Sequence, residues 1–349
     1  MVQRLQASIK DAAARKQALR LRGSGTKDFY GQRLEGELLD TRYYAGIVAY
    51  EPTELVVTAR CGTPLAELEE LVAGKGQMLA FEPPHFGAEA TLGGCLAAGI
   101  SGPRRASAGA VRDFVLGVKI INGRGEMLTF GGQVMKNVAG YDLPRLMVGA
   151  LGTLGLIAEA SIKVLPRPVA EATLRFEMPE DKAIETMNRW SGRPLPISAT
   201  CWCDGELSVR LSGARAAVAA AREQLGGIVI DDGAEFWHSL REQFHPYFLG
   251  DVPSWRLSVP STTPPLMLPG QQLIEWGGAQ RWVRTAAEAY TLRDAARAAG
   301  GHATLYRAPE KTGEVFSPLS APLMKLHRRL KLAFDPDGIF NPGRMYADL

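Results

Sequence analysis

The sequence predicts an α+β protein built from two domains, and three observations support this. At 349 residues the chain is longer than one hydrophobic core usually organises. Its first half reads as β-β-α-β, and its second half has the order β-α-β-β-α-β, which is typical of an antiparallel sheet with helices on one face. A stiff Pro166-Arg167-Pro168 junction separates the two halves.

Composition excludes several classes of protein. Hydrophobic residues at 46% and charged residues at 22% are ordinary for a soluble globular chain, and a net charge of +3 indicates neither nucleic acid nor an anionic membrane as partner. The four cysteines include no C-x-x-C pair, so the sequence predicts no iron–sulfur or zinc site and a reducing compartment. A charged N-terminus and the absence of a long apolar run predict neither a signal peptide nor a membrane span. We therefore expect a cytoplasmic protein.

The first half predicts an N-terminal helix over residues 2–19, a second helix over 65–73 and a short helix after residue 140. The second helix is the best defined, because Thr63 can cap it, Pro64 suits its first turn and Gly74 ends it. The expected strands cover residues 18–22, 36–41, 46–50, 54–60, 77–81, 114–122 and 126–130, with one more ending at residue 165.

Residues 82–112 form a segment with six glycines and a centre of small, apolar residues. Glycine at this density costs conformational entropy, so it indicates positive-φ turns or a backbone that lies against another group. The segment is either a buried binding site made of main-chain N–H groups or a tight connection between strands.

Residues 23–27, Gly-Ser-Gly-Thr-Lys, follow a strand and form a second small-residue loop. Successive N–H groups in such a loop can bind an anion, and Arg22 or Lys27 can add positive charge. The loop lacks the Gly-Lys-Ser/Thr ending of a Walker motif and the helix signal of a dinucleotide fingerprint, so it is a weak indication by itself.

The second half alternates strands and helices. Strands are expected over 171–177, 197–203, 206–211, 227–231, 254–259, 271–276 and 302–307, and helices over 181–190, 214–225, 286–299 and 323–334. Near the end of the sequence, Asn341-Pro342-Gly343-Arg344 is a turn signal that predicts a clasp returning to the first domain.

Five motifs in order carry a resemblance to a known family. They are RGSGTK, PPHFGAEATLGG, VRDFVLGVKIINGRGE, GYDLPRLMVGALGTLGLIAEASIKVLPRP and GIFNPGR. Together they resemble the vanillyl-alcohol-oxidase-type flavoproteins, whose FAD-binding domain is of the p-cresol-methylhydroxylase (PCMH) type. The phrases GGQVMKNVAGYDL, PLPIS, LPGQQLIEWGGAQRW and GGHATLYR are similar to the FAD-binding subunits of bacterial glycolate oxidases, and this similarity covers nearly the whole chain.

The resemblance implies a two-subdomain PCMH-type FAD-binding domain over residues 1–168. A ferredoxin-like domain follows over 169–325, and a C-terminal segment, 326–349, returns to the first domain. It also implies FAD as cofactor. The implied FAD contacts are Gly23, Ser24, Gly25, Thr26 and Lys27 at the pyrophosphate; Thr91, Gly93 and Gly94 against flavin and pyrophosphate; Pro83 and Pro84 beside the flavin ring; and Gly152, Thr153, Gly155 and Ile157 on the adenine side.

Three departures from the family pattern qualify what the resemblance implies. Many members carry a histidine in the first loop that bonds covalently to flavin, whereas this chain has Thr26 and Lys27, so we expect non-covalent FAD. Larger hydroxyacid-oxidising relatives carry H-x-G-D-G-N-x-H, and this sequence has no such pattern. Leu151 stands where relatives often have glutamate. The second departure bears on whether this chain oxidises a substrate by itself.

Oxidation of a 2-hydroxy acid requires a base for the hydroxyl proton and a cation for the carboxylate. The candidates for a base are His302, at the start of a strand, and His85, beside the flavin segment. Arg307 and Arg256 are candidates for the cation. The alternatives are a hydrogen-bonded histidine at a strand start and arginines on a solvated strand face.

Two functions of different class follow from the resemblance. In one, the chain is a redox-active glycolate oxidase subunit, with a larger FAD-containing subunit and an iron–sulfur subunit as partners. In the other, it is chiefly a structural or regulatory FAD-binding subunit, and the larger flavin subunit performs the chemistry. A stand-alone FAD-dependent alcohol oxidase is a third reading. The expected location is the cytoplasm, or the inner membrane surface through partner subunits.

Overall fold

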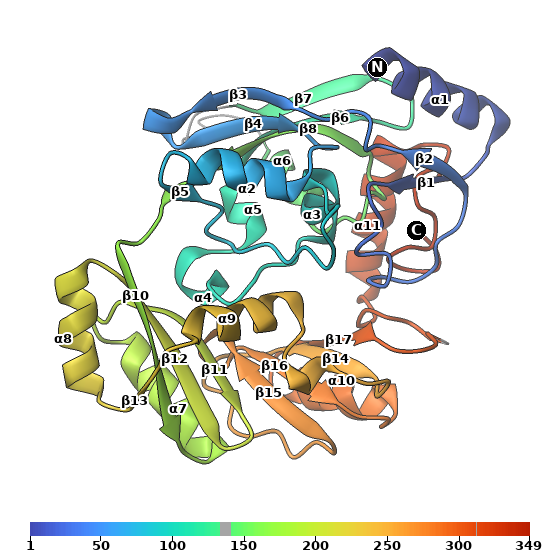
Figure 1. Ribbon diagram of the computed structural model, residues 1–349. Helices are drawn as coiled ribbons and strands as arrows, with labels where there is room; N and C mark the ends of the chain where they lie inside the picture. The colour runs from blue at the N-terminus through green and yellow to red at the C-terminus, as the bar shows by residue number, and fades with distance from the viewer. Residues whose placement is uncertain (133–140, 312) are drawn as a thin grey trace. The chain divides into compact units, whose positions relative to one another are not determined.

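The computed structural model describes residues 1–132, 141–311 and 313–349 (Figure 1). They form two compact units. The first comprises Met1–Ile100, Ala110–Pro166 and Pro318–Leu349, and the second comprises Ser101–Gly109 and Arg167–Ser317. The glycine-rich stretch therefore leaves the first unit at Ser101 and returns at Ala110. The sequence predicts a division into residues 1–168, 169–325 and 326–349. That these are domains in the sense of independently folding parts stays a prediction.

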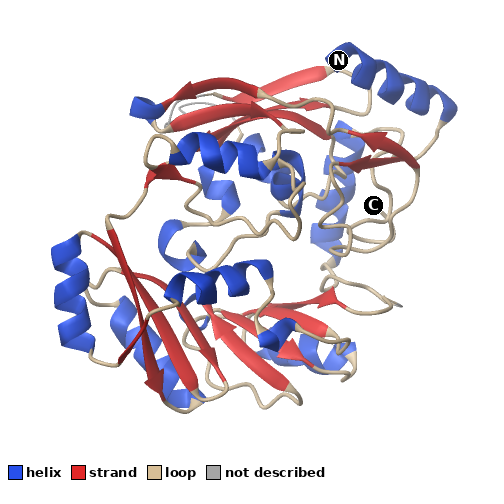
Figure 2. Ribbon diagram, viewed as in Figure 1, coloured by secondary structure: helices blue, strands red, loops and turns tan. Residues whose placement is uncertain are grey.

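The first unit contains a five-stranded antiparallel sheet of order β3-β4-β8-β6-β7. Its strands are β3 (Ile47–Glu51), β4 (Val56–Arg60), β6 (Val115–Ile121), β7 (Met127–Gly131) and β8 (Leu156–Lys163). The central strand β8 is buried along nearly its whole length, as expected for a strand covered on both faces. The helices α2 (Leu65–Ala73), α3 (Leu92–Ala98) and α5 (Val111–Phe114) lie on one face of this sheet (Figure 2). The short helix α6 (Leu143–Met147) and the strand pair β5 (Gln77–Met78) and β9 (Leu165–Pro166) complete it.

A parallel pair of short strands, β1 (Leu19–Arg22) and β2 (Glu37–Asp40), belongs to the same unit. The helix α1 (Val2–Arg15) packs Leu5, Ile9 and Ala12 into a core shared with β1, β8 and the C-terminal segment. It ends four residues earlier than expected because Lys16 adopts a left-handed conformation that turns the chain into β1. After α11 (Ala321–Phe334), the chain runs beside β1, where the Leu19 N–H donates to the Ile339 carbonyl at 2.7 Å.

The second unit is built on one eight-stranded sheet of order β13-β10-β12-β11-β15-β16-β14-β17, in which every pairing is antiparallel. Its strands are β10 (Ala170–Glu177), β11 (Ile197–Cys203), β12 (Glu206–Gly213), β13 (Ile228–Ile230), β14 (Ser254–Ser258), β15 (Gln271–Glu275), β16 (Gln280–Arg284) and β17 (His302–Arg307). The first four have the order of a ferredoxin-like unit, and α7 (Glu180–Ser191) and α8 (Arg215–Leu225) cover one face of them. The α+β prediction with a ferredoxin-like second part is confirmed. The remaining helices are α4 (Arg105–Ala108), α9 (Gly233–Glu242) and α10 (Ala289–Ala298).

Apart from the short helix α4, two elements of the second unit were not expected from the sequence. The helix α9 covers the sheet face opposite α7 and α8, where the Trp237 Nε1–H donates to Thr173 Oγ1 at 2.9 Å. The strand β16 reads Gln-Arg-Trp-Val-Arg, but four of its five residues are buried. Its polar side chains find partners inside: Arg281 is fully buried and donates to the carbonyls of Gly278 and Thr263 at 2.7 and 2.6 Å. These partners come from tertiary structure, so no local pattern indicates the strand.

None of the helices within the described ranges has the length and apolar character that crossing a bilayer requires.

Candidate cofactor-binding site

One pocket of the first unit collects three segments that are far apart in the sequence. They are the loop after β1, the start of α3 and the C-terminal turn. The residues that line the pocket are 21–28, Leu34, Thr91, Gly94, Ala97, Ala98, Leu151, Asn341 and Arg344. The pocket therefore unites the two small-residue loops that the sequence singled out.

The loop after β1 offers a row of unused donors. Among the residues that the structure describes, no acceptor is recorded for the N–H groups of Gly23, Ser24, Gly25 and Thr26. The Asp28 N–H closes the turn by donating to the Gly25 carbonyl at 2.9 Å. Because half-buried N–H groups need partners and successive ones form an anion-binding concavity, this loop fits a diphosphate.

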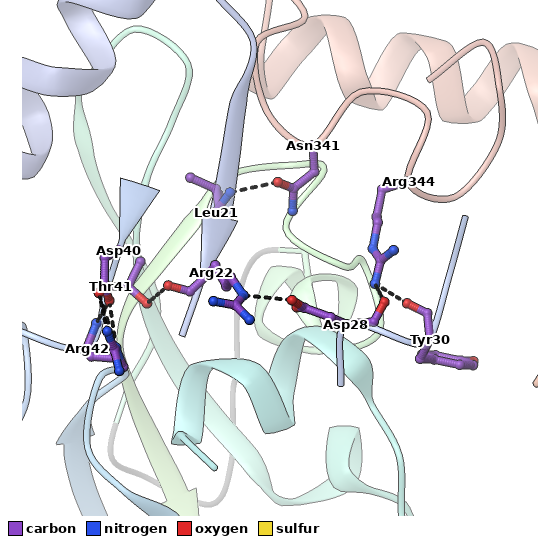
Figure 3. Close-up of polar contacts among 9 residues, drawn as sticks. All are labelled: Leu21, Arg22, Asp28, Tyr30, Asp40, Thr41, Arg42, Asn341 and Arg344. Atoms are coloured by element: carbon purple, nitrogen blue, oxygen red, sulfur yellow. Dashed lines mark hydrogen bonds and ion pairs between the residues drawn. The ribbon is translucent and has the colours of Figure 1, made fainter. Parts of the chain in front are cut away.

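Positive side chains line the same pocket, and Figure 3 draws two of them, Arg22 and Arg344. Arg22 Nε lies 2.7 Å from Asp28 Oδ2, so one carboxylate offsets one guanidinium. Arg344 donates to the carbonyls of Gln32 at 2.6 Å, Asp28 at 2.9 Å and Tyr30. Burial lowers the pKa of Arg344 to about 10, so it stays charged at neutral pH. Lys27 Nζ is fixed 3.2 Å from the His85 carbonyl oxygen. With one carboxylate against three cations, these four side chains favour an anion.

Two glycines allow the pocket segments to approach each other closely. A Cβ on Gly23 would lie 2.4 Å from Thr91 Oγ1, so only glycine lets the β1 loop contact the start of α3. A Cβ on Gly152 would lie 2.7 Å from Asn341 Nδ2, and Gly152 has a φ of 73°. The glycines of these motifs thus serve contacts between segments as well as the backbone donors themselves.

The start of α3 contributes less than the sequence predicted. The N–H groups of Leu92 and Gly93 donate to the carbonyls of Thr63 at 2.9 Å and Cys61 at 2.7 Å, and the Gly94 N–H donates to Thr91 Oγ1 at 3.2 Å. Gly94 lines the pocket, whereas Gly93 faces Cys61, whose carbonyl oxygen would lie 2.9 Å from an added Cβ. A role for Gly93 in cofactor binding stays a prediction, and its evident contribution is the packing of α3 against the end of β4.

The other predicted FAD residues are not among those that line the pocket. Pro83 and Pro84 are buried. Thr153 is buried, and its carbonyl oxygen accepts from Lys331 at 2.9 Å. The residues Gly155 and Ile157 lead into β8. Leu151, which the sequence marked as a departure from relatives, lines the pocket in a left-handed conformation. For Pro83, Pro84, Gly152, Thr153, Gly155 and Ile157, FAD contact stays a prediction, and residues 133–140 of the GGQVMKNVAGYDL phrase lie outside the described residues.

The four candidate catalytic residues do not form one cluster within either unit: His85 belongs to the first unit, whereas His302, Arg256 and Arg307 belong to the second. Arg256 of β14 lies close enough to His302 for its charge to act on the imidazole. In the first unit, His85 Nε2 lies 3.2 Å from Glu69 Oε2 of α2, an ion-pair geometry that fixes the ring. In the second unit, His302 and Arg307 occupy the two ends of β17, roughly 16 Å apart along the strand at 3.3 Å per residue. Partial desolvation of the imidazole and, second, the positive charge of Arg256 lower the pKa of His302. His302 and Arg307 are therefore too far apart to hold the same small hydroxy acid.

Sequence reasoning treated Asn341 and Arg344 only as parts of a clasp. In the structure, Asn341 Oδ1 accepts from the Leu21 N–H at 2.8 Å, and its Nδ2 donates to the Leu151 carbonyl at 2.6 Å (Figure 3). This one amide joins β1 to the turn before β8 at the edge of the pocket. The GIFNPGR motif could have signalled a pocket role, but its partners lie 320 and 190 positions away.

Replacing Asn341 with leucine is expected to lower the free energy of unfolding by about 2 kcal/mol or more and to reduce FAD retention. The substitution leaves the Leu21 N–H and the Leu151 carbonyl without partners, and each such buried group costs about 1–3 kcal/mol. Urea unfolding and the flavin-to-protein absorbance ratio measure the two effects. Asn188→Leu is the matched control, because Asn188 makes comparable bonds in the second unit, to Ile184 and Ser261. Equal flavin loss in both variants would contradict the prediction.

Comparison with known proteins agrees with the fold. Residues 2–131 match the family of FAD binding domains, and residues 310–345 match the C-terminal domain of FAD linked oxidases. Alkyldihydroxyacetonephosphate synthase superimposes with a TM-score of 0.67 at 16% identity, covering 97% of this chain and 73% of that one. This likeness shows a shared fold.

Curated relatives fall into two groups. The glycolate oxidase subunit GlcE of Escherichia coli is 51% identical over 347 residues, which are 99% of this chain and 98% of that subunit. The glycolate oxidase subunit GlcD of Bacillus subtilis is 34% identical over 44% of this chain and 33% of that subunit. A mitochondrial D-lactate dehydrogenase of Saccharomyces cerevisiae is 30% identical, again over 44% of this chain, and over 28% of its own length. The chain belongs to the family of the glycolate oxidase subunit GlcE, whose fold carries an FAD-binding domain.

Proposed function

We propose that this chain is the FAD-binding subunit of a multi-subunit glycolate oxidase that converts glycolate or D-lactate to the 2-oxo acid. The observation that carries the proposal is the pocket with four unused N–H groups at Gly23–Thr26 and cations from Arg22, Lys27 and Arg344. The near full-length similarity to GlcE supplies the substrate class.

The described residues fit a non-covalently held FAD. The N–H groups of residues 23–26 would hold the diphosphate, and Lys27 and Arg344 would offset its charge. Thr26 and Lys27 stand where a histidine would be needed for a covalent bond, and His85 faces Glu69. FAD supplies an acceptor for the hydride of the hydroxy acid, and fixed protein donors stabilise the charge that it gains.

The proposed partners are a larger FAD-containing subunit and an iron–sulfur subunit. The relatives include subunits named GlcD and GlcE, which supports an assembly of several chains. An iron–sulfur partner is proposed because electrons need an onward carrier, and the sequence has no C-x-x-C pair to hold a cluster of its own. We place the assembly in the cytoplasm, or at the inner membrane surface through its partners.

A second candidate is a structural or regulatory FAD subunit, with the chemical step on the larger flavin subunit. The positions of His302 and Arg307 at opposite ends of β17 favour this alternative. The sequence also lacks the H-x-G-D-G-N-x-H pattern of larger oxidising relatives.

Anaerobic addition of glycolate or D-lactate to the purified, FAD-loaded chain distinguishes the two candidates. Bleaching of the flavin absorbance within seconds to minutes is the result expected if this chain performs the oxidation. Flavin that stays oxidised until the partner subunits are added assigns the chemistry to them. Dithionite reduction in the same cuvette is the control that the bound flavin is redox-competent.

A further inference from the structure

The helix α11, red in Figure 1, carries an exposed apolar stripe that the proposed cofactor site does not use. Leu323 and Leu326 are 49% and 51% exposed, and Leu330 is half-buried. Because these leucines are three and four positions apart, they lie along one side of the helix, and we call them the α11 stripe. Lys331 and Phe334 anchor another side of α11 in the protein interior. The helix is therefore fixed to its unit and still presents an apolar side to solvent.

The charge of α11 is entirely positive. Its sequence contains four lysines and arginines, one histidine and no acidic residue. Arg328 and Lys331 each pair with an aspartate. Lys325 and Arg329 are exposed, and no ion pair joins either of them to a residue in the described ranges. These two are four positions apart, and Arg329 follows Leu326 by three, so they form a basic edge beside the stripe.

A segment of the chain itself already lies on a neighbouring side of α11. Arg328 Nη2 lies 2.7 Å from Asp348 Oδ2, and the ring of His327 meets the ring of Tyr346 edge-on, with 6.3 Å between the centroids. This segment thus contributes one carboxylate and one aromatic side chain to the helix. The same two kinds of group, a carboxylate for the basic edge and apolar side chains for the stripe, are complementary to the side that stays exposed.

The spacing of the stripe favours a helical partner. Apolar residues at alternating three- and four-residue intervals form the contact row of two packed helices, whereas a strand repeats every second residue. An anionic bilayer fits less well, because the stripe is narrow, only two cations stand beside it, and another side of α11 is already buried. A second copy of α11 also fits less well, since it would bring a second basic edge to the first with no acidic residue on either helix.

We propose that the α11 stripe docks an acidic amphipathic helix of a partner subunit, whose apolar side covers the leucines and whose glutamates or aspartates face Lys325 and Arg329. This proposal rests on the proposed function, because it requires partner subunits. Burial of the stripe favours association, and the charges select the partner and fix its orientation on α11.

The test uses the full chain, co-expressed with the two other proposed subunits of the oxidase. Leu326→Gln is expected to weaken assembly by about tenfold or more, because it places an amide in the centre of the stripe. Lys325→Glu combined with Arg329→Glu is expected to weaken it at least as much, because carboxylates then face carboxylates. FAD content stays unchanged in both variants, since none of these residues lines the cofactor pocket.

Cross-linking identifies the partner helix directly. A zero-length carbodiimide reagent joins a lysine to a carboxylate only where the two are in contact. In the wild-type assembly it is expected to link Lys325 to a glutamate or aspartate of another subunit, and mass spectrometry of the linked peptides then gives the sequence around that carboxylate.

Two control variants match these changes. Leu332 is 63% exposed on the same helix, but it follows Leu326 by six positions and faces about 120° away from it, so Leu332→Gln leaves the stripe intact. Arg215→Glu combined with Arg222→Glu makes the same change of net charge on an exposed side of α8. Both controls are expected to assemble like the wild-type chain.

The outcomes separate this proposal from the proposed function. If the wild-type chain does not assemble at all, the multi-subunit function is wrong and the α11 proposal fails with it. If Leu326→Gln and the charge-reversed variant assemble as tightly as the wild type, only the α11 proposal is wrong. Binding of the isolated chain to phosphatidylglycerol vesicles that charge reversal abolishes, with assembly unaffected, would replace the partner helix with an anionic membrane surface. Dimerisation of the isolated chain that Leu326→Gln abolishes would replace it with a second copy.

Discussion

Replacement of Gly25 with valine is expected to weaken FAD binding roughly 100-fold or more while leaving the protein folded. Gly25 has a φ of 82°, a left-handed conformation that a β-branched residue rarely adopts. An added Cβ would lie 2.0 Å from an Arg22 guanidinium nitrogen, and Asp28 holds that guanidinium at 2.7 Å. The loop must therefore open, which separates the four donors and releases Arg22. The flavin-to-protein ratio after gel filtration measures the loss.

Gly76→Val is the matched control for strain. Gly76 has a φ of 67°, and no atom lies within 4 Å of an added Cβ, so this variant has the same backbone penalty without the clash. It is expected to retain FAD and to lose less thermal stability than the Gly25 variant, because it has the backbone penalty alone. Full flavin occupancy in the Gly25 variant would show that residues 23–27 do not hold the cofactor.

The sequence predicts most elements of this fold because their patterns are local. Residues 65–73 form α2 as expected, since a proline, an apolar stripe and a glycine mark its limits. The expected Thr63 cap is wrong: Pro64 is the N-cap, and the Thr63 hydroxyl accepts from the Gly46 N–H at 2.8 Å instead. The loop at 23–27 and the glycine-rich stretch could be singled out in the sequence because of their unusual composition. In the structure they meet in one pocket. The family resemblance adds to these local patterns, because it relates motifs that lie far apart in the sequence and that no rule of residue spacing connects.

What the sequence does not predict depends on contacts between distant residues. Nothing near Asn341 indicates that it bonds to Leu21, 320 positions earlier. Gly93 and Gly94 are adjacent and identical in type, but one faces Cys61 and the other faces the pocket. Arg281 makes β16 look like a polar segment, but it is buried: two of its guanidinium nitrogens donate to the carbonyls of Gly278 and Thr263, and the third lies 3.6 Å from Glu180 Oε1. In each case the deciding partner is fixed by tertiary structure.

Replacement of Lys331 with methionine is expected to lower the free energy of unfolding by about 3–5 kcal/mol, as breaking a buried ion pair does. Lys331 Nζ donates to Asp335 Oδ2 at 2.7 Å and to the carbonyls of Thr153 and Phe340 at 2.9 and 2.7 Å. Burial lowers the pKa of Lys331, and the Asp335 carboxylate opposes this effect. Asp335 is 1% exposed, so without the cation its charge is buried unpaired. Urea unfolding of the FAD-free protein measures the change.

An exposed ion pair between α11 and the C-terminal tail provides the control. Arg328 and Asp348 are also 2.7 Å apart, but their side chains are 57% and 63% exposed. Arg328→Met is therefore expected to change the free energy of unfolding by less than about 1 kcal/mol. Adding Asp335→Asn to Lys331→Met removes the unpaired charge and is expected to recover part of the loss. Because Lys331 ties Thr153 to Phe340, directly before the pocket residue Asn341, the single variant is also expected to lose FAD. Unfolding energies that fall equally for Lys331→Met and Arg328→Met would show that burial of this pair does not stabilise the C-terminal segment.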